Sequence, residues 1–149
     1  MRYTLLLHYP ERAGDISDEE VRQGMNSFDK WAKDLNGAGA LVSAEMFQHT
    51  PETTTVQLVN ETIQVNEGPA DDVPDPIGGV VVIDVADHGD AVYWAKHAPS
   101  LAWGPVEIRG GMVRFTEGEW HPVVEHGAAI PSPYDSEELR EVASPAAPL

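Results

Sequence analysis

The sequence predicts a single α+β domain with an antiparallel sheet, and three observations lead to this class. The chain has 149 residues, enough for one hydrophobic core. Its segments follow the order strand, helix, strand, hairpin, strand, helix, strand. The strand–helix–strand pattern of the first half recurs in the second. This is the order of a split βαβ unit, in which both helices pack on one face of the sheet.

The first strand and first helix are expected between residues 2 and 37. Residues 2–9 carry apolar side chains on nearly both faces, which indicates an interior strand. Ser17 and Glu20 have the spacing of a capping box, so a helix should begin there and end near Asn36-Gly37. One stripe of this helix should face the core, with Trp31 beside it. The stripe comprises Val21, Met25, Phe28, Ala32 and Leu35.

A second strand is expected at residues 40–47, and a hairpin of strands 53–59 and 62–65 should turn at Asn60-Glu61. Residues 66–76 contain three prolines and four acidic residues, which is typical of a loop.

The β-branched run from Val80 to Val85 predicts a central strand. Asp87 or Asp90 can cap the second helix, which Pro99 should end, and residues 106–109 supply the last strand of the core. The buried side of this helix is expected to comprise Ala91, Val92, Trp94, Ala95 and Ala98.

The chain divides into a domain of residues 1–112 and an acidic, proline-rich C-terminal extension of residues 113–149, partly extended or wrapping the dimer. An edge strand over residues 113–120 and a short helix over residues 136–142 are the elements expected in it. The sheet face away from the helices should be apolar, and a large exposed apolar surface signals a partner. We assign to it Leu5, Leu7, Val56, Val80 and Val82. A face-to-face homodimer is therefore expected.

The charge pattern excludes several partners. Twenty-five acidic against nine basic residues give a net charge of −16, which repels nucleic acid and anionic membranes. No apolar run approaches the roughly 20 residues of a membrane span, and the N-terminus does not resemble a secretory signal, so a cytoplasmic protein is expected. The chain has no cysteine, phosphate-binding glycine loop or metal-pair spacing of histidines. We expect neither a metal nor an organic cofactor.

An ordered series of motifs runs along residues 1–110. The series comprises Met1-Arg2-Tyr3, Gly68-Pro69, Ile77-Gly78-Gly79, Ile83-Asp84-Val85, Ala91-Val92-Tyr93-Trp94-Ala95 and Val106-Glu107-Ile108-Arg109. With it the chain resembles the YCII-related proteins of the DGPF type. The resemblance implies a ferredoxin-like domain that dimerises into an α/β barrel, within a superfamily of monooxygenases, isomerases, lyases and polyketide-modifying enzymes.

The sequence departs from the family at its signature motif. Glu67-Gly68-Pro69-Ala70 stands where the family reads Asp-Gly-Pro-Phe, so the acid and the turn are kept and the aromatic residue is lost. A His–Asp pair proposed for relatives has no convincing counterpart, because Ala98 occupies the acid position before Pro99.

Histidines and carboxylates are the candidates for acid–base chemistry. His8, within an apolar strand, is the first candidate base, and Glu45 would be its partner if their strands adjoin on one face. Glu67 in the signature motif and His49 in a loop are the other catalytic candidates. A hydrogen-bonded structural role is the alternative for His8, and an arginine is the expected mate of Glu107.

Aromatic residues predict a pocket for a flat apolar ligand. Phe47, Trp31, Trp94 and Trp103 would wall it, although the two helical tryptophans could instead be plain core. His97 is placed beside them, and its alternative is to complement the negative end of the second helix.

These residues favour a small cofactor-free enzyme that performs isomerisation, cyclisation or elimination on an apolar metabolite, for example an aromatic or polyketide-like one. The alternative is a non-catalytic small-molecule-binding or regulatory dimer module. A cofactor-free monooxygenase is a third option that rests on the superfamily alone.

Overall fold

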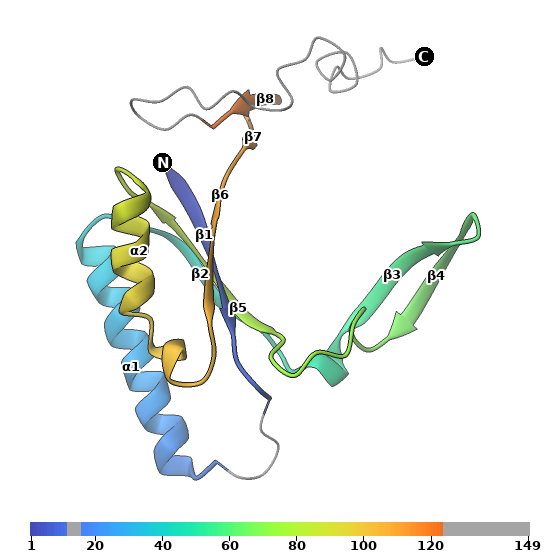
Figure 1. The fold of residues 1–149 in the computed structure, drawn as a ribbon, viewed down its shortest axis with the longest axis horizontal. Coiled ribbons are helices and arrows are strands. Elements are labelled where there is room, and N and C mark those ends of the chain that lie inside the picture. The colour runs from blue at the N-terminus through green and yellow to red at the C-terminus, as the bar shows by residue number, and fades with distance from the viewer. Residues whose placement is uncertain (12–15, 124–149) are drawn as a thin grey trace.

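A computed structural model describes residues 1–11 and 16–123 and has an α+β fold with antiparallel sheets (Figure 1). The elements are β1 (Arg2–His8), α1 (Asp18–Gly37), β2 (Leu41–Met46), the 3₁₀ turn η1 (Thr50–Glu52), β3 (Thr54–Val59), β4 (Thr62–Glu67), β5 (Ile77–Asp84), α2 (His88–Lys96), the 3₁₀ turn η2 (Pro99–Ala102), β6 (Val106–Gly110), β7 (Val113–Thr116) and β8 (Glu119–Pro122).

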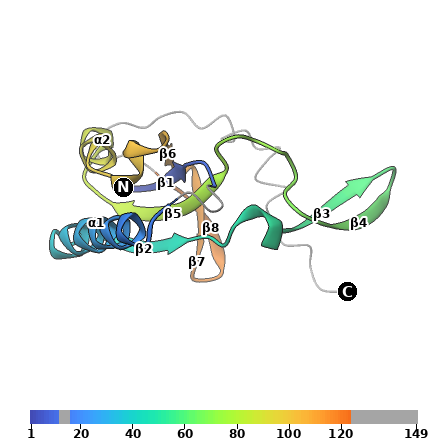
Figure 2. The ribbon, with the colours of Figure 1, turned by 90° about the horizontal axis from the view of Figure 1, so that it is seen from below.

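The main sheet has the strand order β2-β5-β1-β6, and all its neighbouring strands are antiparallel. Both helices lie on one face of it (Figures 1 and 2). The core lies between the sheet and the helices, because every second side chain of β1 and β5 points to that side. Its largest members are Tyr3, Leu5, Leu7, Trp31, Leu35, Val81 and Ile83.

The opposite face of the sheet, called here the open face, differs from the expectation. Leu5 and Leu7 are fully buried under the helices, and Val56 belongs to a separate hairpin. Only Val80 and Val82, with Leu6 beside them, belong to the open face, and all three are half-buried. The prediction was wrong because β1 is apolar on both faces, so its sequence alone does not say which set the helices cover.

Helix α1 begins as predicted and packs differently. Ser17 accepts a hydrogen bond from the Glu20 backbone and Glu20 reaches back to Ser17, which confirms the capping box. Trp31 is buried in the core, whereas Val21 and Met25 are 48% and 68% exposed. The N-terminal half of α1 extends past the end of α2 (Figure 1). The apolar stripe therefore continues beyond the part of the helix that the core covers.

Strands β3 and β4 form a two-stranded hairpin, which projects from the body on the side opposite the helices (Figures 1 and 2). Its turn is at Asn60 and Glu61, both with positive φ, which confirms the predicted turn. Gly68, at φ +95°, closes the base of the hairpin: its N–H donates to the Thr53 carbonyl, and its carbonyl accepts from the Thr55 hydroxyl. A residue without a Cβ, as at Gly68, is thus favoured for this turn.

The expected edge strand over residues 113–120 was wrong. Strands β7 and β8 pair with each other instead, through a turn at Glu117-Gly118, and do not extend the main sheet. The helix predicted at residues 136–142 lies outside the described residues. Neither α1 nor α2, the two α-helices that the structure describes, combines the length and apolarity of a membrane span.

Candidate functional site

An open groove of about 1460 Å³ lies on the helix side of the sheet and is the main candidate site. Residues 20–34 of α1 form one wall, and the end of α2 with η2 forms the other. Residues 9–11 after β1, Met46 at the end of β2 and His49 beyond it complete the lining. We call it the α1–η2 groove.

Aromatic side chains dominate this groove. The ring of Phe28 stacks on that of Trp103, with centroids 6.4 Å apart. The rings of Phe28 and Trp31 meet edge to face, also with centroids 6.4 Å apart. Trp103 also meets Tyr9 edge to face. Trp103 lies in the short connection between η2 and β6, whereas Phe28 lies in α1. Two separate elements therefore supply one continuous aromatic surface. Trp103 remains 42% exposed, so this surface is open to a ligand.

The charged residues of the groove are already engaged within the chain. Glu11 accepts hydrogen bonds from the backbone and hydroxyl of Thr50, both at 2.7 Å. Lys30 pairs with Asp34, and Glu20 is held in the capping box. Burial, followed by the negative charge of Glu11, raises the pKa of Tyr9, whose hydroxyl donates to the Gly78 carbonyl. The groove therefore offers a ligand no free ionic partner among its described residues.

Two histidines line the groove. The Nδ1 of His97 lies 2.7 Å from the Tyr93 carbonyl at the end of α2. Because a carbonyl only accepts, Nδ1 carries the hydrogen, and in the neutral ring Nε2 then keeps its lone pair. His97 thus does complement the helix end, as one alternative predicted, and it retains a nitrogen that can accept a proton. His49 caps η1 without a side-chain hydrogen bond to that turn.

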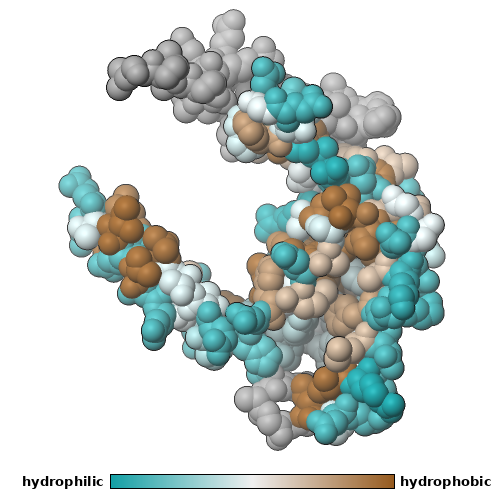
Figure 3. Space-filling view, turned by 180° about the vertical axis from the view of Figure 1, so that it is seen from behind, coloured by the Kyte–Doolittle hydropathy of each residue, from teal (hydrophilic) through white to brown (hydrophobic). Residues whose placement is uncertain are grey.

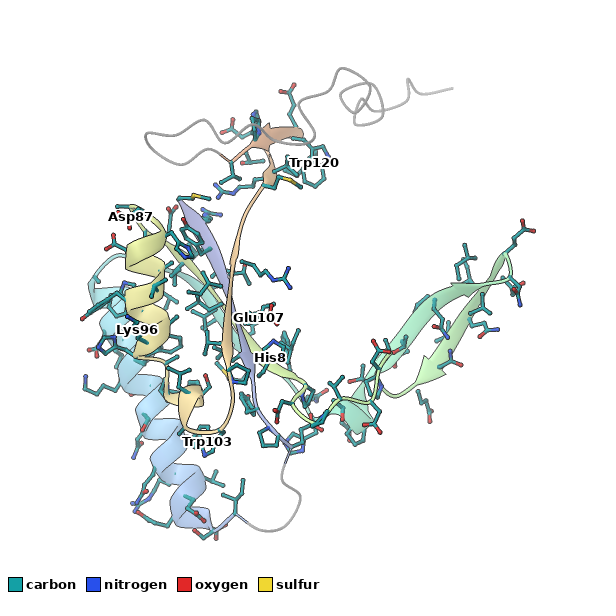
Figure 4. The ribbon with its side chains drawn as sticks, in the orientation of Figure 1. His8, Asp87, Lys96, Trp103, Glu107 and Trp120 are labelled. Carbon is teal, nitrogen blue, oxygen red and sulfur yellow. The ribbon has the colours of Figure 1, made fainter. Side chains whose placement is uncertain are left out.

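His8 lies on the open face and not in the groove. Its Nε2 is 2.9 Å from Glu107 Oε1, and its Nδ1 is 3.2 Å from the Asp75 carbonyl. Figure 4 shows His8 and Glu107 together on one side of the sheet and Trp103 on the other. Both partners are hydrogen-bond acceptors. The catalytic role of His8 stays a prediction.

The other predicted residues are dispersed. Glu45 does not adjoin His8, because β5 lies between β2 and β1 in the sheet. Glu67 is exposed at the base of the hairpin, opposite Thr54. Phe47 is 44% exposed and follows β2, outside the groove lining.

The groove does contain a majority of the predicted binding residues: Trp31, Trp94, Trp103, His97 and also His49 line it. The sequence reasoning missed Tyr9, Met25, Phe28 and Tyr93 as lining residues. The sequence does contain a signal for Met25 and Phe28. They belong to the apolar stripe of α1, which is longer than the part of the helix that the core covers.

Glu107 is shared between Arg109 and His8, which allows a test of the open-face cluster. Arg109 donates to it from Nε at 3.1 Å, and its terminal nitrogen is 2.9 Å away, so the arginine mate was correctly predicted. The hydrogen bond from Arg109 is the main cause that lowers the pKa of Glu107 below 4.5, and the charge of His8 adds to it.

We expect Arg109→Gln to raise the pKa of Glu107, because the hydrogen bond from Arg109 is the largest cause that lowers it. A carbon-13 NMR titration of the carboxyl group measures this. Since folding lowers this pKa, the stabilisation is present above pH 4.5 and is lost as the pH falls through the folded-state value. Arg114→Gln on β7 is the control. An identical titration of Glu107 in Arg109→Gln and wild type would contradict the assignment.

Comparison with protein-family models finds no match, and neither does comparison with curated proteins. Within residues 1–11 and 16–123, no group of three or more histidines and carboxylates could hold a metal ion.

Proposed function

We propose that the protein binds a neutral, flat, apolar small molecule in the α1–η2 groove. The observation that carries the proposal is the aromatic surface of Phe28 and Trp103, which is left open between two elements in front of the buried Trp31, while the neighbouring charges are internally paired. Apolar burial drives the binding of such a ligand, and aromatic stacking orients it. The net charge of −16 further disfavours anionic ligands.

Titration with a neutral naphthylamine fluorophore tests this proposal, with its sulfonated, anionic analogue as the matched control. We expect saturable binding of one neutral molecule per chain, quenching of tryptophan fluorescence because three tryptophans line the groove, and weaker binding of the anion. Absence of saturation, or equal affinity for both probes, would overturn it.

Acid–base catalysis on the bound molecule is the second candidate function, and the position of His97 favours it. Its Nδ1 is fixed by the Tyr93 carbonyl, so Nε2 is the free proton acceptor of a ring that lines the groove. His49 lies in the same lining and supplies a second group of suitable chemistry. The substrate would be an activated carbon acid, and the reaction would be an isomerisation, cyclisation or elimination.

Deuterium incorporation separates catalysis from binding. Any compound that the protein retains from the cells producing it can be identified by mass spectrometry and incubated with the protein in D₂O. An enzyme of this type exchanges a carbon-bound hydrogen, and His97→Gln should abolish the exchange while the compound still binds. If the wild type binds the compound without exchanging its carbon-bound hydrogen, the catalytic function is refuted and the binding function remains supported.

The arrangement of the sheet supports a ferredoxin-like fold and, with it, the proposed likeness to YCII-related proteins. The order β6-β1-β5-β2 with both helices on one face is the arrangement that a split βαβ unit produces. We also propose a homodimer through the open face. Its support is the half-buried set Leu6, Val80 and Val82, which no helix among the described residues covers.

A further inference from the structure

The β3–β4 hairpin, residues 54–67, is called here the arm, and its two faces differ in chemistry. On one face Val56 lies directly opposite Val65, and Leu58 lies opposite Ile63. These four side chains belong to residues that are 65–71% exposed. On the other face Gln57 lies opposite Gln64. Figure 3 shows the hydrophobic patch on the arm and the hollow that separates the arm from the body.

An arm of this kind requires a covering surface. An isolated two-stranded hairpin is at best marginally stable in water, because its apolar face has nothing to pack against. The turn at Asn60 and Glu61 also places two non-glycine residues at positive φ, which adds a cost. Four neighbouring aliphatic side chains on one face are a contiguous patch of the type that marks an interaction site.

The position of the arm identifies the occupant as a second copy of this chain. The arm projects on the open-face side of the sheet, away from the helices (Figure 2). The apolar groups of the open face include Leu6, Val80, Val82 and Ile77, which pairs with His8. This is a small set for an interface of about 800 Å² per partner. If two copies meet at their open faces, each arm extends beside the other copy and supplies the missing apolar area.

The charge of the arm favours the same partner. Residues 54–67 contain no basic residue, and their two acids, Glu61 and Glu67, stand at the turn and at the base. Between two chains of net charge −16, association is least opposed where the surface is uncharged. A strongly basic partner would find no attraction on the apolar face of the arm.

We propose that the apolar face of the arm packs on a second copy of the chain, next to the open face, so that two arms clasp the dimer reciprocally. The inference rests on the proposed homodimer and is independent of ligand binding in the α1–η2 groove. Leu58 and Ile63, the cross-strand pair nearest the tip on this face, are the anchors.

Sedimentation equilibrium of the full chain over a wide concentration range tests the arm with two matched double variants. Leu58→Gln/Ile63→Gln changes a cross-strand pair on the apolar face, and Gln57→Thr/Gln64→Thr changes the adjacent pair on the polar face. We expect the first variant to weaken dimerisation by about 100-fold or more, as the loss of two buried aliphatic side chains implies, and the second to match the wild type.

Two further measurements keep the result interpretable. All four tryptophans lie outside the arm, so a native near-ultraviolet circular dichroism spectrum shows that the body of the variant is folded. Amide hydrogen exchange of residues 54–67 in the wild type should slow as the protein concentration rises through the dimer dissociation constant.

Each alternative outcome has its own meaning. Equal dimerisation of wild type and Leu58→Gln/Ile63→Gln would remove the arm from the interface and leave a dimer through the open face. A wild type that is monomeric at all concentrations would overturn both the arm and the homodimer. Neither result changes the fluorophore titration, so failure of the arm is distinguishable from failure of the groove.

Discussion

Replacing Gly104 with alanine should lower the free energy of unfolding by about 3 kcal/mol or more, with a fall of about 10 °C in Tm. A Cβ at this position would lie 1.9 Å from the His8 carbonyl oxygen, 2.8 Å from its carbon and 3.1 Å from the Tyr9 Cα. These are backbone atoms, so no side-chain rotation relieves the overlap. The end of β1 and the loop after η2 would have to separate, although the His8 N–H bonds the Pro105 carbonyl there.

Urea denaturation followed by tryptophan fluorescence measures this effect, and Gly37→Ala is the control. Gly37 is the last residue of α1, and a Cβ there meets nothing within 4 Å. Alanine at Gly37 should leave stability unchanged or raise it by up to about 1 kcal/mol. A Gly104→Ala protein with a Tm within 2 °C of wild type, a margin well below the expected shift, would show that this close approach is not required.

Replacing Gly24 with leucine should weaken ligand binding in the α1–η2 groove and leave the fold intact. Gly24 lies on the groove wall of α1, where a Cβ would stand 3.5 Å from the Trp103 ring, an ordinary contact. The remaining atoms of leucine would then occupy the space next to the exposed Trp103 surface. Because leucine forms helices better than glycine, stability should rise by up to about 1 kcal/mol.

The fluorophore titration with Gly24→Leu checks this, and Gly37→Leu provides the same substitution outside the groove lining. We expect affinity at least about tenfold weaker for Gly24→Leu, because filling the groove removes more than one methylene of ligand contact, and unchanged affinity for Gly37→Leu. Equal affinities in the two variants would locate the ligand elsewhere on the molecule.

Local signals in the sequence predicted the elements well. Ser17 and Glu20 place the start of α1 because their hydrogen bonds are formed within four residues. Asp87 caps α2 in the same way through the Asp90 N–H. Nearest-neighbour chemistry of this kind is independent of the rest of the fold, so it can be identified without tertiary information.

The candidate site was predicted only in part. Trp31, Trp94 and Trp103 do line one groove. The predicted partner of His8, Glu45, was wrong, because Glu45 belongs to β2 at the far edge of the sheet. Glu107 on β6 is the carboxylate that approaches His8. Sequence spacing does not report which strands become neighbours.

The sequence by itself determined the order of strands and helices up to residue 110, which residues are apolar, and the charge that disfavours anionic partners. Tertiary structure alone decided which apolar residues are covered. Leu5 is buried and Leu6 is left on the open face, and Leu35 is buried whereas Met25 of the same stripe lines a groove. The physical reason is that periodicity defines the faces of an element, whereas burial depends on what packs against each face.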